Sequence, residues 1–559
     1  MNLQSTFDIP EICFQFGVKH AVISPGSRNA ALTIAFARHP QIECLSVPDE
    51  RSAAFIALGL SLKTQVPTVI VCTSGSAGLN YAPAVAEAFF NQVPLLILTA
   101  DRPPELIGKR DGQTIFQKEL YGPHVKAYFD FPSLEDDTDQ AQELLEKALN
   151  TCLTGAKGPV HLNIPFQEPF YPEKDKSYQA RKNIRITKAV PPQTQVKPEQ
   201  IQEMDKYPRV LIIVGQGHKD SELNESLSQL SRERNIPVVA DVISNAQEVT
   251  DCIQHQDLFL IQRDSRLKPD LVISFGLSVI SKNLKLFLRE QKDIAHWHIT
   301  PNEDAADTYD HLSKTLSCTA LDFLNAWNKS DLNPSAEQKS FFSDWQKANQ
   351  QANALLEGID PMDWNESSLY ARLMKELPQN TDVHLANSMA VRYANVMGIK
   401  QKDIEIYCNR GTSGIDGSNS TAVGTALASK RNTLLFTGDV AFLYDRNAFW
   451  HNRVPDQLRI VVFNNQGGNI FRMIQGPSEQ PELKEFFETD QRSTALHLAE
   501  EFGFNYRPIA SMEELDEHLP QFFSFEGQRS ILEIFTEAED NKKAYKQLFK
   551  KMRDLSLSN

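Results

Sequence analysis

The chain has 559 residues, which is too long for one ordinary hydrophobic core and predicts about three domains. Its 57 basic and 72 acidic residues give a formal net charge of −15, and this balance argues against nonspecific binding to nucleic acid or to an anionic membrane. The seven cysteines are scattered without a Cys-x-x-Cys pair, so we expect neither a zinc site nor a disulfide framework.

The first 180 residues begin without a secretion signal and then alternate apolar and alanine-rich segments. Because the start lacks a basic region and an apolar region, and because no uncharged apolar run approaches membrane-spanning length, we expect a cytoplasmic protein without a membrane span. Residues 20–24, 68–72 and 94–99 have the composition of buried strands, and residues 52–63 that of a helix. Strands that alternate with helices predict a parallel sheet, so the expected fold class is α/β.

Residues 170–198 are rich in proline and charge, which is typical of a linker. A second α/β unit is predicted over residues 195–335, where residues 209–217 and 270–276 read as strands that run into glycine turns. The turn at Gly215 lacks the third glycine of the dinucleotide-binding fingerprint. We therefore expect a Rossmann-like domain here rather than a bound dinucleotide.

A charged helical stretch over residues 336–358 precedes a third α/β unit, which is predicted over residues 355–559. In this unit a strand that begins at Thr433 ends in the acid Asp439, and a second apolar run ends in the amide Asn465. Ligands of open α/β sheets bind at the carboxyl ends of the strands, so we expect the acid and the amide to share one site.

Asp439, Asn465 and the carbonyl group of Gly467 suit a hard cation that carries a diphosphate. Mg²⁺ prefers octahedral oxygen coordination and usually keeps water and phosphate oxygens, so the protein need supply only a carboxylate, an amide oxygen and a carbonyl. Mn²⁺ would satisfy the same ligands. Residues 444–452 predict a helix whose free backbone amides face the phosphate oxygens. The alternative is that these residues form an ordinary turn and a polar loop.

The sequence Gly438-Asp439, followed at this distance by Asn464-Asn465, resembles the cofactor motif of thiamine diphosphate-dependent enzymes. The family usually has a third glycine where this chain has Val440. The resemblance implies thiamine diphosphate and Mg²⁺ as cofactors, and three consecutive doubly wound parallel-sheet domains. These are a pyrimidine-binding domain at 1–180, a central Rossmann-like domain at 195–335 and a diphosphate- and Mg²⁺-binding domain at 355–559.

Glu50 matches the position at which such enzymes carry a glutamate against the aminopyrimidine ring of the cofactor. Its role would be to hydrogen-bond ring nitrogen N1′ and so to favour the imino tautomer that removes the C2 proton. On composition alone, Asp49-Glu50-Arg51 is also typical of an acidic helix start with a surface ion pair. Since Glu50 and Asp439 lie on different domains, the resemblance implies a homodimer with active sites between subunits, with a dimer of dimers left open.

Further motifs resemble one subfamily, which acts in menaquinone biosynthesis and joins 2-oxoglutarate to isochorismate. These motifs are residues 24–29, 73–78, 99–105, 112–115, 387–392, 409–416 and 438–445. A hydrophobic residue is expected at position 440 in this subfamily, which accounts for Val440. The resemblance implies a transferase that decarboxylates 2-oxoglutarate and adds the succinyl-semialdehyde unit to isochorismate by 1,4-addition. The alternatives are another thiamine diphosphate-dependent decarboxylase or carboligase, a noncatalytic regulatory relative, and a nicotinamide dehydrogenase based on the Gly215 turn.

The two substrates carry several carboxylates, so an acidic protein needs local cations to bind them. The cations that match subfamily positions are Arg28, Lys282, Arg392 and Arg410. A preorganised arginine would stabilise the charge that develops at the acceptor carboxylate, and we nominate Arg392 or Arg410 without choosing between them. Asn283 stands where the subfamily can carry a second basic residue, and Lys285 is either a partial substitute or solvated surface.

The resemblance also implies uncharged contacts to the substrates and the cofactor. Ser27 and Gln113 would hydrogen-bond substrate carboxylates or hydroxyl groups. An apolar wall, or alternatively ordinary core, is expected from Ile470, Phe471 and Ile474. The cofactor contacts expected besides Glu50 are Ser388, Ser413, Ile415, Asp439, Val440, Ala441, Asn465 and Gly467, with Ile415 matching the bulky residue that props the cofactor into its bent shape.

Overall fold

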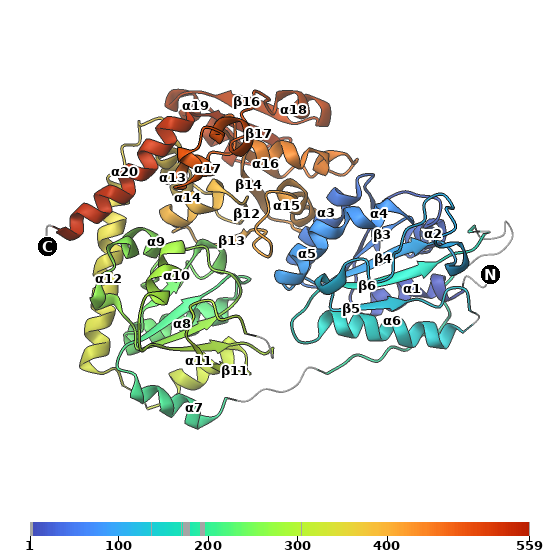
Figure 1. Cartoon of the computed structure of the whole chain (residues 1–559), viewed down its shortest axis with the longest axis horizontal. Helices are drawn as coiled ribbons and strands as arrows, with labels where there is room; N and C mark the ends of the chain where they lie inside the picture. The colour runs from blue at the N-terminus through green and yellow to red at the C-terminus, as the bar shows by residue number, and fades with distance from the viewer. Residues whose placement is uncertain are drawn as a thin grey trace.

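Three parallel sheets follow one another along the chain, which confirms the predicted α/β fold class (Figure 1). The computed structural model describes residues 4–135, 137–168, 170–171, 179–190, 196–302, 305–331 and 333–557. Figure 1 shows the first domain in blue, the middle domain in green and the third domain in orange to red. Among the described residues, no helix has the length and apolar character needed to cross a membrane.

The first sheet has six strands in the order β2-β1-β3-β4-β6-β5. Its strands are β1 His20–Ile23, β2 Glu43–Ser46, β3 Thr68–Cys72, β4 Leu95–Asp101, β5 Ala127–Asp130 and β6 Val160–Pro165. Its helices are α1 Gln4–Gln15, α2 Ala30–Arg38, α3 Glu50–Thr64, α4 Ser76–Asn80, α5 Ala82–Phe90 and α6 Thr138–Leu153. Every residue of β3 and β4 is buried, as expected for parallel strands that helices cover on both faces.

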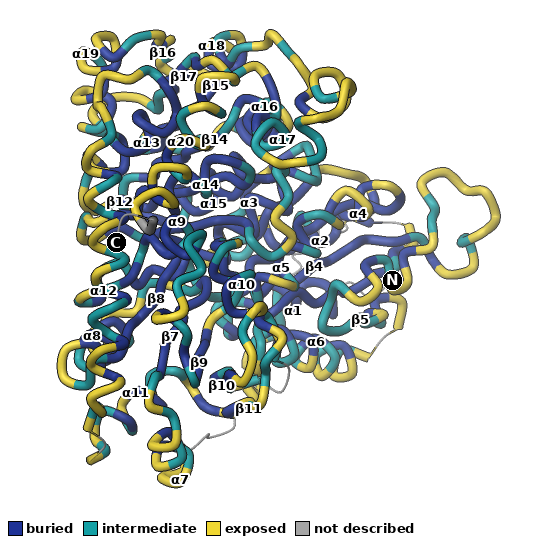
Figure 2. The backbone as a smooth tube through the Cα atoms, turned by 60° about the vertical axis from the view of Figure 1, so that its left-hand side comes forward, coloured by how far each residue is buried: buried dark blue, intermediate teal, exposed yellow. Residues whose placement is uncertain are grey.

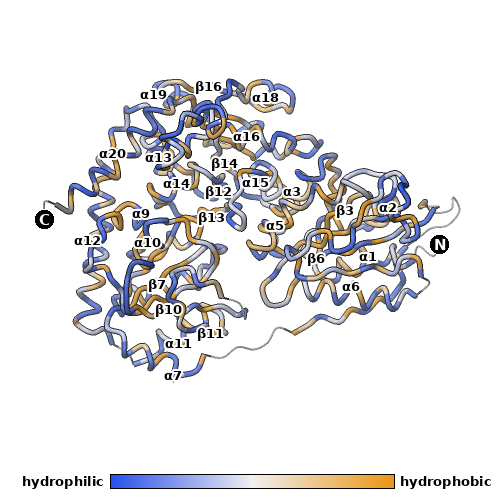
Figure 3. The backbone as a smooth tube through the Cα atoms, viewed as in Figure 1, coloured by the Kyte–Doolittle hydropathy of each residue, from blue (hydrophilic) through white to orange (hydrophobic). Residues whose placement is uncertain are grey.

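The middle sheet has five strands in the order β11-β10-β9-β7-β8. Its strands are β7 Val210–Val214, β8 Val238–Ala240, β9 Leu271–Phe275, β10 Ala295–Ile299 and β11 Leu312–Leu316. Its helices are α7 Pro198–Gln202, α8 Ser221–Arg234, α9 Gln256–Phe259, α10 Lys282–Arg289 and α11 Ala320–Asn328. The charged stretch predicted to be helical is α12, Ala336–Glu357, which leads into the third domain. In Figure 3 the strand β7 is hydrophobic, whereas α12 is largely hydrophilic.

The third sheet has six strands in the order β13-β12-β14-β15-β17-β16, which repeats the strand order of the first sheet. Its strands are β12 Thr381–Leu385, β13 Ile404–Tyr407, β14 Asn432–Gly438, β15 Leu458–Asn464, β16 Asn505–Ile509 and β17 Ser530–Phe535. Its helices are α13 Glu366–Lys375, α14 Met389–Met397, α15 Ser418–Ala428, α16 Asp439–Tyr444, α17 Ile470–Met473, α18 Leu496–Phe502, α19 Met512–Phe523 and α20 Ala538–Leu557.

The prediction of a helix over residues 444–452 is wrong. Helix α16 begins at Asp439, directly after β14, and ends at Tyr444, and only a short 3-10 turn follows at Arg446–Phe449. The helix ends there because the buried Asp445 carboxylate accepts hydrogen bonds from the backbone N–H of Ser420 at 2.7 Å and from its hydroxyl at 2.8 Å. The predicted metal ligand therefore lies on the first residue of the helix rather than before it.

The glycine turn after β7 serves packing inside the middle domain. Its backbone continues to pair with β9, since Gly215 N–H donates to the carbonyl of Phe275, the last residue of that strand, at 2.8 Å. A Cβ atom at position 215 would overlap the carbonyl oxygen of Leu277. The glycine is thus explained by the close approach of two backbones, as expected for a Rossmann-like domain without the full fingerprint.

The first and third domains share one hydrophobic core through the crossing of α3 and α15, which lie side by side in the buried centre of the molecule (Figure 2). The two backbones approach closely, because a Cβ atom on Gly424 would overlap the carbonyl oxygen of Ile56. At one end of α3, Lys63 pairs with Asp382 at 2.9 Å and with Glu405 at 3.0 Å. A second core joins the middle domain to the third.

Candidate active site

Asp439 and Asn465 follow the neighbouring central strands β14 and β15 directly. The Asp439 side chain is 2% exposed. Its Oδ1 atom accepts a hydrogen bond from the backbone N–H of Val440 at 2.9 Å, and its Oδ2 atom accepts one from Gln491 Nε2 at 2.8 Å. Burial raises the pKa of Asp439 to about 6, so the carboxylate lies in a site that favours a compensating positive charge.

Asn465 presents an amide oxygen that nothing in the described structure uses. Its Nδ2 group donates a hydrogen bond to Glu366 Oε1 at 2.7 Å, whereas its Oδ1 atom is buried without a hydrogen-bond partner among the described residues. Buried polar atoms of this kind usually have partners, and an amide oxygen beside a carboxylate is a ligand that Mg²⁺ accepts. The residues present therefore fit a hard divalent cation that takes its remaining ligands from diphosphate and water.

The described residues contain no cluster of three or more His, Cys, Asp or Glu side chains that could hold a metal ion. A purely protein-built cation site is thus not the arrangement seen here. One carboxylate, one amide oxygen and one carbonyl suffice only when a ligand such as a diphosphate brings further oxygens.

Glu366 and Gln491 were missed by sequence reasoning, although they fix the two ligand side chains. Glu366 begins α13 and is fully buried, and its carboxylate also accepts a hydrogen bond from Thr536 Oγ1 at 3.3 Å. Burial raises the pKa of Glu366 to about 7. Because Glu366 lies 99 positions from Asn465, no local pattern in the sequence could have revealed the contact.

The segment after Asn465 folds back on itself beside the site. Gly468 N–H donates to the carbonyl of Glu488 at 2.6 Å, and the Glu488 carboxylate binds Arg472 at 2.5 Å. Of the predicted apolar wall, Ile470 and Phe471 are half-buried and Ile474 is 43% exposed. This partial exposure differs from ordinary core and leaves apolar surface for a ligand.

Asn387 joins the two motif segments of the third domain. Its Nδ2 group donates to the carbonyl groups of Asn409 and Gly414, both at 2.6 Å. Ser388 and Ser413 stand beside these contacts and have positive φ angles of 74° and 62°. Such backbone conformations are costly for serine and concentrate at functional sites. The structure thus brings both predicted cofactor-binding serines to one place.

Arg392 and Arg410 also meet at this junction. Arg392 Nη1 donates to the carbonyl of Ser388 at 2.5 Å, and Arg410 Nη1 donates to Asn387 Oδ1 at 3.0 Å, so both partners are neutral. Arg410 Nε is buried without a hydrogen-bond partner among the described residues. Burial and the nearby Arg410 lower the pKa of Arg392. Two neighbouring guanidinium groups whose hydrogen-bond partners are neutral have the chemistry that an anion site requires.

The predicted cation Lys282 and the two neighbours considered with it, Asn283 and Lys285, lie on α10. Lys282 is exposed at the start of α10, and Asn283 is engaged elsewhere, since its Nδ2 group donates to the carbonyl of Asp257 at 2.7 Å. Lys285, one helical turn further on, is half-buried. Burial lowers the pKa of Lys285, the nearby Asp241 carboxylate raises it, and the nearby Arg410 lowers it again.

The candidate residues of the first domain gather on loops after its strands. Ser27 and Gln113 are exposed, and the Gln113 backbone has a positive φ of 57°. Gln117 fixes the neighbouring loop, because its Oε1 atom accepts a hydrogen bond from Gly75 N–H at 2.8 Å. Arg28 is turned into its own domain, where its Nη1 group donates to the carbonyl of Phe166 at 2.9 Å.

Glu50 is the first residue of α3, as the sequence predicts. Asp49 caps the helix by accepting a hydrogen bond from Arg51 N–H at 2.9 Å, and the Arg51 side chain donates to the carbonyl of Tyr444 at 2.7 Å rather than to a carboxylate. The Glu50 carboxylate accepts one long hydrogen bond, from Asn80 Nδ2 at 3.4 Å. Among the described residues, no hydrogen bond joins Glu50 to the metal ligands of the third domain.

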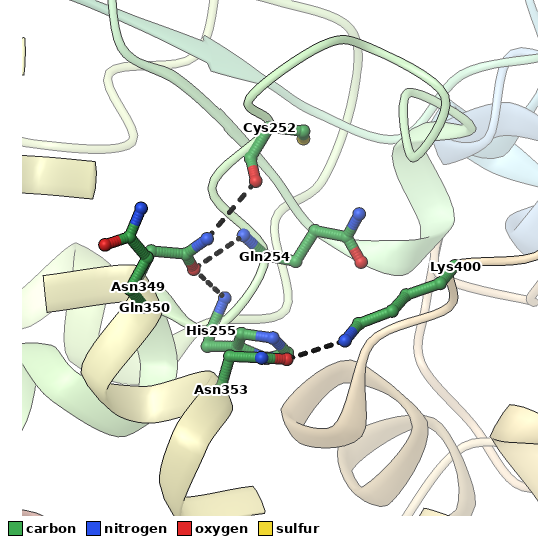
Figure 4. Close-up of a pocket in the computed structure, with 7 residues that line it drawn as sticks. All are labelled: Cys252, Gln254, His255, Asn349, Gln350, Asn353 and Lys400. Carbon is green, nitrogen blue, oxygen red and sulfur yellow. Dashed lines mark hydrogen bonds between the residues drawn. The ribbon is translucent and has the colours of Figure 1, made fainter. Parts of the chain in front are cut away.

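A separate cavity of about 240 Å³ lies between the middle domain, α12 and the third domain (Figure 4). It is lined by Cys252, Gln254, His255, Asn349, Gln350, Asn353 and Lys400. Its polar groups bind one another: Asn349 Oδ1 accepts from His255 N–H at 3.2 Å, and Lys400 Nζ donates to Asn353 Oδ1 at 2.8 Å. None of the predicted site residues lines this cavity.

Comparison with known proteins gives matches over the whole chain. Residues 8–124 match the N-terminal TPP binding domain of thiamine pyrophosphate enzymes, and residues 177–385 match a family described as the middle domain of thiamine pyrophosphate. A 2-succinyl-5-enolpyruvyl-6-hydroxy-3-cyclohexene-1-carboxylate synthase of Cytophaga hutchinsonii is 42% identical over 572 residues, covering 100% of both chains.

Two further relatives have the same name. That of Desulfotalea psychrophila is 38% identical and covers 96% of this chain and 98% of the relative. That of Flavobacterium johnsoniae is 36% identical and covers 97% of this chain and 98% of the relative. With this identity over the full length and with matches to two thiamine pyrophosphate enzyme domains, the chain belongs to the thiamine diphosphate-dependent 2-succinyl-5-enolpyruvyl-6-hydroxy-3-cyclohexene-1-carboxylate synthase family.

Proposed function

We propose that this chain decarboxylates 2-oxoglutarate and adds the resulting succinyl-semialdehyde unit to isochorismate, as a transferase of menaquinone biosynthesis. Membership of the family supports this reaction. The observation that carries the proposal is the buried Oδ1 atom of Asn465, which has no hydrogen-bond partner among the described residues and follows the strand adjacent to that of Asp439. Such an oxygen pair is suited to a cation that anchors a diphosphate.

The proposed metal ligands are Asp439, Asn465 and the carbonyl oxygen of Gly467, with Mg²⁺ as the expected ion and Mn²⁺ as an ion that the same oxygens accept. Glu366 and Gln491 orient the two ligand side chains through the hydrogen bonds described above. When bound, thiamine diphosphate would supply the electron sink for decarboxylation. The further cofactor contacts that we propose are Glu50, Ser388, Ser413, Ile415, Val440 and Ala441.

Substrate carboxylates are proposed to bind at Arg392 and Arg410, with Lys285 on α10 as a further cation. Each arginine donates to a neutral oxygen, so its charge is available to an anion. The Asn283 amide is already bound to α9, and for this reason we propose Lys285 as the additional cation of this chain. An arginine held in this way stabilises charge that develops on the acceptor without reorganising. The other proposed substrate contacts are Ser27, Arg28, Gln113, Lys282, Ile470, Phe471 and Ile474.

We propose a homodimer in which the first domain of one subunit completes the site of the other. The support is that Glu50 and Asp439, which would contact opposite ends of one cofactor, lie on different domains. Exposed aromatic side chains such as Phe116, Trp450 and Phe486 favour burial against a partner. A dimer of dimers is a further assembly that this arrangement permits.

Two experiments test the function and the shared site. Purified protein incubated with isochorismate, 2-oxoglutarate, thiamine diphosphate and Mg²⁺ should give the coupled product, whereas carbon dioxide release without coupling would indicate a decarboxylase. Mixing the Glu50→Gln and Asp439→Ala variants after reversible dissociation should restore activity, since each mixed dimer contains one intact site. No restoration would contradict sites shared between subunits.

We also propose the domain boundaries 1–180, 195–335 and 355–559, each of which contains one sheet.

A further inference from the structure

Glu87 is a buried carboxylate of the first domain that binds a loop of the third domain. It lies on α5 and is 1% exposed. Its Oε1 atom accepts hydrogen bonds from Gly411 N–H at 2.8 Å and from Asn91 Nδ2 at 3.3 Å. Its Oε2 atom accepts from Thr412 N–H at 2.7 Å and from the Thr412 hydroxyl at 2.9 Å. Each oxygen thus accepts two hydrogen bonds. Only an ionised carboxylate has two oxygens that both accept hydrogen bonds without donating one.

The loop approaches α5 at backbone distance. A Cβ atom on Gly411 would lie 2.5 Å from the carbonyl oxygen of Glu87 and 3.0 Å from the backbone nitrogen of Asn91. Any larger residue at position 411 would therefore push the loop away from the helix. The contact joins residues more than three hundred positions apart, so it fixes one domain against another.

The loop that Glu87 holds is the segment 409–416, which carries Arg410, Ser413 and Ile415. From the other side, Asn387 donates hydrogen bonds to the carbonyl groups at both ends of this loop. The two residues that Glu87 binds lie directly between Arg410 and Ser413. A shift of Gly411 or Thr412 therefore moves the guanidinium group and the strained serine together.

Hydrogen bonds compensate the Glu87 carboxylate, and no ion pair to it is found among the described residues. Burial raises its pKa, the Thr412 and Gly411 backbone amides and the Thr412 hydroxyl lower it, and Asp416 raises it again. A buried carboxylate is expensive unless hydrogen bonds compensate it, and an apolar side chain would fill the same volume at lower cost. Unlike an apolar side chain, the carboxylate fixes the positions of the four groups that donate hydrogen bonds to it.

We propose that Glu87 is a positioning residue for the reaction, which acts from the first domain by holding the loop that presents Arg410 to the substrate. This inference rests on the proposed function, because Arg410 matters only if that loop faces the substrates. Glu87 itself touches neither substrate nor cofactor and is not a catalytic residue.

The test is a double-mutant cycle between Glu87→Gln and Arg410→Ala, measured on coupled-product formation. Glutamine has the shape of glutamate but only one acceptor oxygen, so two of the four donors then face an NH₂ group. We expect Glu87→Gln to lower kcat/KM for isochorismate by about tenfold or more. In the Arg410→Ala background the same substitution should have little further effect, since the group that it positions is absent.

Additive losses in the cycle, or an unchanged kcat/KM in Glu87→Gln, would overturn the inference. If Glu87→Gln does not fold, as judged by circular dichroism, Thr412→Val takes its place because it removes one bond to the same carboxylate. Thr412→Ser keeps that hydroxyl and should retain wild-type coupling; equal behaviour of the two Thr412 variants would also overturn the inference. Absence of coupled product with the wild-type protein would instead refute the proposed function.

Discussion

Glu366 is expected to set the metal affinity of the site by orienting the side chain of Asn465. Its Oε1 atom accepts the hydrogen bond from Asn465 Nδ2 at 2.7 Å, and the amide oxygen is thereby left to face the cation. Glu366→Leu removes the acceptor and lets the amide rotate. A buried hydrogen bond to a charged group contributes about 1.5–3 kcal/mol, which corresponds to Mg²⁺ binding weakened by roughly 10- to 150-fold.

Calorimetric titration of Mg²⁺ at saturating thiamine diphosphate measures this change, and the electron paramagnetic resonance spectrum of bound Mn²⁺ reports any altered ligand. Thr536→Val is the matched control, because it removes the other hydrogen bond to Glu366, at 3.3 Å, without touching Asn465. Its metal affinity should change by less than about threefold. Wild-type Mg²⁺ affinity in a folded Glu366→Leu variant would refute the reasoning, and equal losses in both variants would assign the effect to the Glu366 pocket as a whole.

Four further outcomes are expected. Asp439→Ala should abolish Mg²⁺-dependent binding of thiamine diphosphate, measured by calorimetry with and without Mg²⁺, because its carboxylate is the only charged ligand proposed. An unchanged affinity for thiamine diphosphate would exclude Asp439 as a metal ligand. Glu50→Gln should bind the cofactor but exchange its C2 proton slowly in deuterium exchange, and a wild-type exchange rate would exclude Glu50 from activation. Lys285→Ala should raise KM for a substrate by about tenfold, whereas Lys292→Ala, at an exposed lysine outside the proposed site, should change it by less than about threefold; equal effects would remove Lys285 from the site. Arg410→Ala should still release carbon dioxide from 2-oxoglutarate, followed with an artificial electron acceptor, yet lose coupling by roughly 30- to 1000-fold; equal losses in both would move Arg410 to the donor half of the reaction.

The strands of the parallel sheets and the neighbouring positions of Asp439 and Asn465 could be predicted because they depend on local pattern. The apolar run at 68–72 is β3, and Asp439 and Asn465 lie at the ends of adjacent strands as their positions after apolar runs indicated. The bounds of α16 could not be predicted, because the helix begins directly after β14 and ends beside Asp445, whose carboxylate binds Ser420 in another helix. Contacts of this kind join residues far apart in sequence and leave no periodic signal.

The site residues show the same division. Motif resemblance named Ser388 and Ser413, but nothing in a serine indicates a positive φ, since that conformation is imposed by the surrounding structure. Glu366 and Glu87 read as ordinary helix residues, and only the folded chain brings them to Asn465 and to the loop at Thr412. The residues that the resemblance assigns to ligands could thus be named from the sequence, whereas the residues that hydrogen-bond to them in the fold could not.

The middle domain contacts the site through β13, which is the edge strand of the third sheet. Side-chain amides of the middle domain bind alternate residues along its free edge. Gln247 Nε2 donates to the carbonyl of residue 404 at 3.1 Å, Asn245 exchanges two hydrogen bonds with residue 406 at 2.7 and 3.0 Å, and Gln216 Nε2 donates to the carbonyl of residue 408 at 3.0 Å. These contacts satisfy backbone groups that an open edge would leave unpaired.

Arg410 lies two residues after Cys408, the last residue that the middle domain binds here, so its position depends on all three domains. The middle domain fixes the strand before it, Glu87 of the first domain fixes the residues after it, and Asn387 of the third domain binds its guanidinium group. A change at any one of these contacts can be accommodated only by moving the arginine or by breaking the others. The glycine turn after β7 contributes Gln216 to this arrangement, which gives the Rossmann-like domain a role at the site without a nucleotide.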